Sequence, residues 1–124
     1  MNKLILMFVL SLVSLWGADM HSYKEAVSLQ KQIKKTILLG VVRTDCHYCE
    51  DMEENFFSDP EMLKYLDDKF IMAKINISKE KLPLGLKVNF TPTFFILSTD
   101  LKVIKTIPGS WNKQDFKDLT KGIK

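Results

Sequence analysis

Two cysteines stand close together in the chain, in the stretch Cys46-His47-Tyr48-Cys49. They follow an apolar run, residues 37–42, and precede a stretch with helical spacing of apolar residues. A thiol at the beginning of a helix faces the positive end of the helix dipole and free backbone N–H groups, which stabilise its thiolate form. We therefore predict that Cys46, nearer the helix end and more exposed, is a nucleophile, and that Cys49, one turn inward, resolves the mixed disulfide.

Charges next to the first cysteine act on it in opposite directions. Protonated His47 would favour the thiolate of Cys46, whereas the nearby carboxylates oppose it. Charges exposed to water are screened over about 8–10 Å, while hydrogen bonds at the helix end are direct. We expect the pKa of Cys46 to be lowered overall. The acidic residues either complement the helix dipole or form a rim that selects basic partners or docks a membrane-bound reductase; they are Asp45, Glu50, Asp51, Glu53 and Glu54.

Other uses of the two cysteines remain open. A purely structural disulfide over so short a loop would restrain the unfolded chain little. A copper or zinc site could use Cys46 and Cys49 with His47 or Met52, because soft thiolates suit Cu(I). We prefer thiol–disulfide exchange, which needs no cofactor and no metal, because the electrons travel through the two cysteines.

The surrounding sequence alternates between helical and strand patterns. Ser22 and Glu25 form a capping-box signature, Asp59 and Pro60 are typical of a second helix start, and Asn112 opens a last helix. The predicted elements are a helix over 22–35, a strand over 37–42, helices after 46 and after 59, strands over 70–77, 93–97 and 102–107, and a helix after 112. This order predicts an α/β fold with one mixed sheet and helices packed on it.

Composition limits the class of protein. The chain has 124 residues, 46% of them hydrophobic and 27% charged, which is typical of a single folded domain. Its 18 positive and 15 negative side chains leave a net charge of +3, which gives no support to nucleic-acid binding. Two cysteines are too few for a disulfide-dense miniprotein or a four-cysteine zinc site.

The beginning of the chain has the layout of a secretory signal peptide. Lys3 provides a positive charge, residues 4–16 form an apolar run, and the small residues Gly17 and Ala18 follow. The apolar run would rise about 20 Å as a helix, short of the roughly 30 Å of a bilayer core. We therefore expect residues 1–18 to be a cleaved signal peptide and residues 19–124 to be a domain exported to the periplasm. An uncleaved membrane tether is the alternative.

A second motif adds to the first. Thr91-Pro92 stands at the entry to the predicted strand over 93–97, where an X-Pro bond can be cis. With the cysteine motif after a strand, this makes residues 22–124 similar to the thioredoxin superfamily. The resemblance implies a thioredoxin-like fold, with a central mixed four-stranded sheet flanked by helices. It also implies that Pro92 is a cis-proline facing the cysteines and that Thr91 pairs with the substrate backbone.

Within this superfamily, the residues near the two motifs are not all those of thioredoxin. Tyr48 and Thr91 look more like the residues of periplasmic disulfide isomerases than like those of cytosolic thioredoxin. Asp45 stands where thioredoxin has tryptophan, and Gly40 stands where it has a buried aspartate that moves the proton of the resolving cysteine. Little sequence precedes the first helix, where the family has a leading strand.

The resemblance implies an enzyme, an exported monomeric thiol–disulfide oxidoreductase that acts on the cysteines or disulfides of other exported proteins. We prefer a reductive role, supplied with electrons by a membrane-bound thiol reductase, over an oxidative one. The alternative is a non-enzymatic thiol module, either a Cu(I) carrier or a chaperone-like domain.

Overall fold

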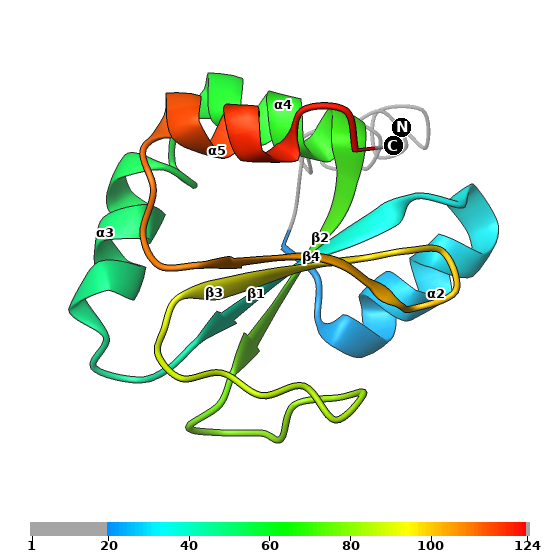
Figure 1. Ribbon diagram of the computed structural model, residues 1–124, viewed down its shortest axis with the longest axis horizontal. Helices are drawn as coiled ribbons and strands as arrows, with labels where there is room; N and C mark the ends of the chain where they lie inside the picture. The colour runs from blue at the N-terminus through cyan, green and yellow to red at the C-terminus, as the bar shows by residue number, and fades with distance from the viewer. Residues whose placement is uncertain (1–19, 124) are drawn as a thin grey trace, which may run out of the picture.

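The computed structural model describes residues 20–123 (Figure 1). Its elements follow in the order α2 (Tyr23–Ile33), β1 (Thr36–Val42), α3 (His47–Asn55), α4 (Pro60–Lys69), β2 (Phe70–Asn76), β3 (Thr93–Leu97), β4 (Val103–Pro108) and α5 (Lys113–Thr120). The predicted signal peptide, residues 1–18, lies outside the described residues. Among the helices of residues 20–123, none combines the length and apolar character that crossing a membrane requires.

The strands within this range form one four-stranded sheet in the order β2-β1-β3-β4. β1 runs parallel to β2, and β3 is antiparallel to both β1 and β4. The sheet is therefore mixed, and the predicted α/β architecture, with one mixed four-stranded sheet, is confirmed. β1 lies in the interior of the sheet, so its carboxyl end carries the chain directly from the core to the cysteine motif.

Each face of the sheet is covered by helices (Figure 1). α2 lies on one face, and α3, α4 and α5 lie on the other. Side chains alternate along a strand; accordingly, Ile37 and Leu39 of β1 belong to the cluster under α2, whereas Leu38 belongs to the opposite cluster. That second cluster also contains Met52 of α3. Burial of Met52 fixes α3, and with it the cysteines, against the sheet.

The helix starts that the sequence predicts are all capped by the expected side chains. The Ser22 hydroxyl accepts a hydrogen bond from the Glu25 backbone N–H at 3.2 Å, and the Glu25 carboxylate accepts one from the Ser22 N–H at 3.1 Å. Asp59 accepts from the Met62 N–H at 2.9 Å, and Asn112 caps α5 in the same way. Each cap satisfies backbone donors that have no partner inside their helix.

A single residue ahead of α2 extends the sheet. His21 forms an isolated parallel bridge with Ala73 on the outer side of β2. Its N–H donates to the Met72 carbonyl at 2.9 Å, and its carbonyl accepts from the Lys74 N–H at 3.1 Å. In the described residues, this bridge occupies the edge of β2 where a longer leading strand would pair.

Candidate active site

The cysteine pair lies at the beginning of α3, as predicted. Cys46 is the N-cap residue of the helix, and it forms a disulfide with Cys49 across a Cα–Cα distance of 5.2 Å. The backbone N–H of Cys49 donates a hydrogen bond to the Cys46 sulfur at 3.2 Å. The sulfur therefore takes the place of the oxygen in an ordinary cap and receives one of the free donors of the helix end. This direct helix-end hydrogen bond is the contact that the sequence predicts.

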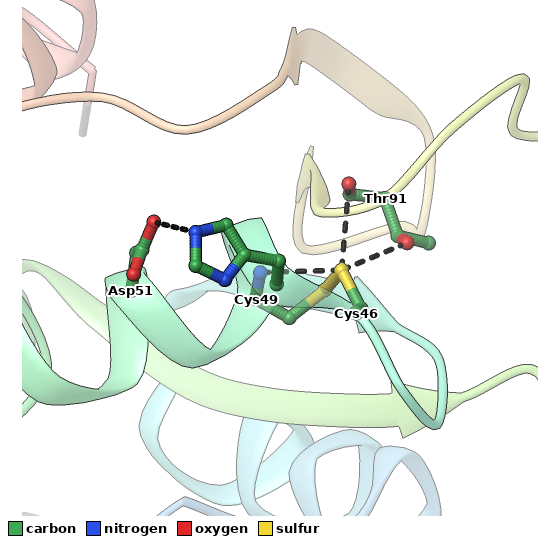
Figure 2. A network of polar contacts seen from close by, with 5 residues as sticks. Cys46, Cys49, Asp51 and Thr91 are labelled. Atoms are coloured by element: carbon green, nitrogen blue, oxygen red, sulfur yellow. Dashed lines mark hydrogen bonds and ion pairs between the residues drawn. A yellow bond between two sulfur atoms is a disulfide. The ribbon is translucent and has the colours of Figure 1, made fainter.

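The loop that contains the second motif packs directly on this sulfur (Figure 2). The Thr91 hydroxyl donates to the Cys46 sulfur at 3.2 Å, and the Thr91 backbone carbonyl oxygen lies 3.6 Å from the same sulfur. The Thr91–Pro92 peptide bond is cis. Two further bonds hold the loop, from the Thr93 hydroxyl to the Phe90 carbonyl and from the Gly109 N–H to the Pro92 carbonyl, each at 2.8 Å. The structure thus brings both motifs together.

The predicted exposure of the first cysteine is wrong. Cys46 is 3% exposed, whereas Cys49 is half-buried. Position at a helix end suggests an open sulfur, but the Thr91 loop folds over it from a distant part of the chain. The candidate nucleophile is therefore distinguished by its hydrogen bonds and not by its exposure. A partner must reach it past the loop.

The two residues between the cysteines point outward. Tyr48 is 62% exposed. The His47 ring lies 3.5 Å from the Asp51 carboxylate, one turn along α3, and the side chains are 81% and 43% exposed, respectively (Figure 2). Such an ion pair is worth about 0–1 kcal/mol. The hydrogen bonds drawn to the Cys46 sulfur thus come from backbone and from Thr91, while His47 is engaged by a neighbouring carboxylate.

An apolar pocket lies behind the second cysteine. It is lined by Cys49, by the ion pair of two charged side chains, and by mostly apolar residues of the sheet, of α3 and of the loops next to them. These include Gly40, Met52, Phe57, Met72, Pro92 and Phe94. The ion pair joins Glu53 to Lys74 at 3.5 Å. Glu53 stands four residues after Cys49, which places the two side chains on the same face of α3. A carboxylate is therefore close to the resolving cysteine.

From the sequence, Glu53 is predicted only to be one of the acidic residues near the motif, and Lys74 is not predicted to lie at the site. The four-residue spacing from Cys49 to Glu53 was a usable signal. Lys74 is brought to the site by the register of β1 and β2, in which it pairs with Gly40. No pattern in the sequence gives that register.

Arg43 also lies at the site, and its role there is not predicted from the sequence. It follows β1 directly, and its Nε donates a hydrogen bond to the Thr91 hydroxyl at 3.2 Å. An arginine directly after a buried strand and three positions before Cys46 was the available signal. Within residues 20–123, no group of three or more histidine, cysteine, aspartate or glutamate side chains is arranged to hold a metal ion.

Comparison with known proteins places the fold. The chain is 26% identical over 74 residues to an uncharacterised protein of Archaeoglobus fulgidus; the match covers 60% of this chain and 57% of the length of that relative. The structure is similar to a thioredoxin from Thermus thermophilus, with a TM-score of 0.73 and 21% identity, over 87% of this chain and 88% of the other.

Two other solved structures are also similar. The oxidised C-terminal domain of DsbD from Neisseria meningitidis gives a TM-score of 0.62 at 16% identity, over 86% of this chain and 100% of the other. A DsbH oxidoreductase gives 0.68 at 18% identity, over 85% of this chain and 83% of the other. At such identities these structures establish a common fold.

The family is established over most of the chain. Residues 23–124 match the family described as a thioredoxin-like domain. The match includes both cysteines and the Thr91-Pro92 loop that packs on them. The chain therefore belongs to the thioredoxin-like domain family, and its Cys46–Cys49 disulfide supports a thiol–disulfide oxidoreductase.

Proposed function

We propose that this protein exchanges electrons with the cysteines of exported proteins, through the Cys46–Cys49 pair. One observation supports the proposal above all others. The Cys46 sulfur accepts hydrogen bonds from the Cys49 N–H and the Thr91 hydroxyl, both at 3.2 Å, at the positive end of α3. Donors that converge on a sulfur stabilise its thiolate, which is the form that attacks a disulfide.

The exchange proceeds in two steps. In the reductive direction, the Cys46 thiolate attacks one sulfur of a substrate disulfide; the Cys46–substrate bond forms, and the substrate S–S bond breaks to release one thiolate, which takes a proton. The Cys49 thiolate then attacks the Cys46 sulfur and releases the second substrate thiolate. The substrate gains two electrons, and the protein ends as the Cys46–Cys49 disulfide. The same steps in reverse oxidise a dithiol.

The second step requires Cys49 to lose its proton, and Glu53 is placed to accept it. Glu53 lies one turn along the same helix face and lines the same pocket as Cys49. Its contact with Lys74, at 3.5 Å, orients the carboxylate. The Glu53 side chain is 61% exposed, so it can pass the proton on to water. We assign to Glu53 the role of proton acceptor for the resolving cysteine.

We propose the periplasm as the compartment, with removal of residues 1–18 and release of a monomeric domain. The signal-peptide pattern supports this location, and the oxidising compartment makes redox use of two cysteines chemically reasonable. Electrons would come from a membrane-bound thiol reductase, and the reduced protein would serve other exported proteins. Thr91 and Pro92 would receive the substrate backbone, since Thr91 of this loop contacts the Cys46 sulfur through both its hydroxyl and its carbonyl oxygen.

Reduction of insulin by dithiothreitol tests the function. We expect the wild-type protein to accelerate the reaction and Cys46→Ser to abolish the acceleration. Cys49→Ser removes only the resolving thiol, so it is expected to accumulate mixed disulfides through Cys46, which mass spectrometry of a periplasmic extract would identify. A wild-type protein that neither reduces insulin nor reshuffles a scrambled disulfide protein would contradict the proposal; Cu(I) binding by both thiols would then favour the metal-carrier alternative.

A further inference from the structure

A chain of two hydrogen bonds connects an exposed cation to the buried sulfur. Arg43 Nε donates to the Thr91 hydroxyl oxygen at 3.2 Å, and that hydroxyl donates to the Cys46 sulfur at 3.2 Å. Thr91 is 6% exposed, so water has little access to replace either partner. A hydroxyl has one proton to donate. Because its oxygen accepts from Arg43, the proton of Thr91 is directed at the sulfur.

The segment that bears Arg43 is itself held in place. The Thr44 backbone N–H donates to the Ser78 hydroxyl at 3.2 Å, and the Asn76 side-chain amide donates to the Thr44 hydroxyl at 3.4 Å. These bonds tie the turn between β1 and α3 to the end of β2. Arg43 therefore approaches the Thr91 hydroxyl from a fixed direction.

We propose that Arg43 is a positioning residue that orients and polarises the Thr91 hydroxyl, and thereby stabilises the thiolate of Cys46 over its thiol. This proposal deepens the proposed function, because it concerns the same sulfur. The Thr91 carbonyl oxygen, 3.6 Å from that sulfur, has the opposite effect, since it can accept the proton of a thiol. The Thr91 hydroxyl favours the charged form of Cys46. The hydrogen bond from Arg43 polarises this hydroxyl and so strengthens the bond that the hydroxyl donates to the sulfur.

The charged side chains around Cys46 affect its thiolate less than the hydrogen-bond chain from Arg43 does. The hollow next to Cys46 is lined by three cationic and three acidic side chains, which are Arg43, Lys74, Lys79, Asp45, Glu50 and Glu53. His47 and Tyr48, which follow Cys46 at the start of α3, are exposed, and His47 contacts Asp51. Opposite charges in equal number largely cancel at a distance, and water screens exposed ones. A bond transmitted through a buried hydroxyl is not screened in this way.

The test is a titration of the reduced protein, followed by the ultraviolet absorbance of the thiolate. A Cys49→Ser background leaves Cys46 as the single thiol. Arg43→Met removes the donor and the charge but keeps an unbranched side chain. We expect it to lower the thiolate-to-thiol ratio of Cys46 by about threefold to tenfold, because the Thr91 hydroxyl still donates to the sulfur but is no longer polarised by Arg43.

Two matched variants separate the hydrogen-bond route from a general charge effect. Lys79→Met removes a cation that lines the same hollow and is expected to change the ratio by less than about twofold. In a Thr91→Val background, which lacks the linking hydroxyl, Arg43→Met is expected to have no further effect. Arg43→Ala repeats the measurement with a shorter side chain, and urea unfolding confirms that each variant is folded.

Three results would overturn the proposal: an unchanged titration in Arg43→Met, an equal shift in Lys79→Met, or an undiminished shift in the Thr91→Val background. The titration requires no substrate. A wild-type protein that lacks insulin-reducing activity but shows the expected shift would therefore refute the function alone, and an active protein with no shift would refute the role of Arg43 alone.

Discussion

Gly40 offers a quantitative test of how the strand beneath the site is packed. It lies inside β1, next to Lys74 of β2 and Phe94 of β3. A Cβ at this position would meet two carbons of the Phe94 ring at 3.4 and 3.5 Å and the Ala73 carbonyl oxygen at 3.8 Å. These are van der Waals contacts that a small movement of the ring accommodates. Gly40→Ala should therefore be accepted.

The expected gain follows from two contributions. Glycine inside a strand costs about 0.5–1 kcal/mol relative to alanine, and a buried methyl group contributes about 0.8 kcal/mol. Adjustment of Phe94 offsets part of this, so we expect Gly40→Ala to raise the free energy of unfolding by about 1 kcal/mol. In a domain of this size the melting temperature should rise by roughly 4–8 °C. Urea unfolding and thermal denaturation of the oxidised protein measure both quantities.

Gly85 provides the control, because its alanine variant is expected to change stability in the opposite direction. Gly85 has a φ of 68°, and nothing lies within 4 Å of the position of its Cβ. Alanine there gains no contact and is held in the left-handed region, at a cost of roughly 1 kcal/mol. A Gly40→Ala protein destabilised by more than about 1 kcal/mol, or changes of the same sign at both positions, would refute this account of the packing.

The other predictions concern proton transfer, the core and acid stability. Glu53→Gln should slow the attack of Cys49 on a mixed disulfide by about tenfold at neutral pH, which is less than the loss of a buried base would cause, because the Glu53 carboxylate is exposed. Glu54→Gln is the control and should leave this rate unchanged. Equal rates for the wild-type and Glu53→Gln proteins in rapid-quench kinetics would remove Glu53 from the mechanism. Phe116→Ala should cost about 3–5 kcal/mol, because Phe116 is fully buried between two aromatic rings, 4.9 and 5.3 Å away; a loss below about 1 kcal/mol in urea unfolding would contradict the packing. The backbone and side-chain hydrogen bonds of Ser22 lower the pKa of Glu25. The stabilising effect of the ionised Glu25 is therefore present above the ordinary pKa of the carboxyl and is lost as the pH falls through the lowered pKa. Glu25→Gln should flatten this decline of the urea midpoint at acid pH, and an identical decline in both proteins would argue against the capping box.

Local signals predicted the elements well because the physics behind them is local. The pairing of Ser22 with Glu25, and of Asp59 with Pro60, satisfies donors within three or four residues, so the helix starts appear in the sequence as short patterns. The apolar run over 37–42 indicates a strand buried on both faces for the same reason. The bounds of the first helix and of the four strands agree with the predicted ranges to within two residues.

Contacts between distant segments could not be predicted in this way. That Thr91 and Pro92 face Cys46 followed from family resemblance, and the burial of Cys46 by Thr91 did not follow from either source. Arg43 and Lys74 take their places through strand register and loop closure, which depend on the packing of the whole sheet. The sequence therefore indicates the candidate reactive residues, while the structure identifies the side chains that contact or surround them.

The pH dependence of Cys46 alkylation in the reduced protein tests the central claim most directly. The midpoint of the rate against pH is the informative quantity, because limited access to Cys46 lowers the alkylation rate at every pH, whereas the midpoint reports the pH at which the thiolate forms. Burial of Cys46 raises that pH, and the hydrogen bonds donated to its sulfur lower it. Peptide mapping by mass spectrometry separates Cys46 from Cys49. We predict a midpoint for Cys46 clearly below about 8.5, the value of a free cysteine, with Cys49 titrating at higher pH. A Cys46 midpoint at or above that of a free cysteine would contradict the claim that α3 and Thr91 stabilise its thiolate.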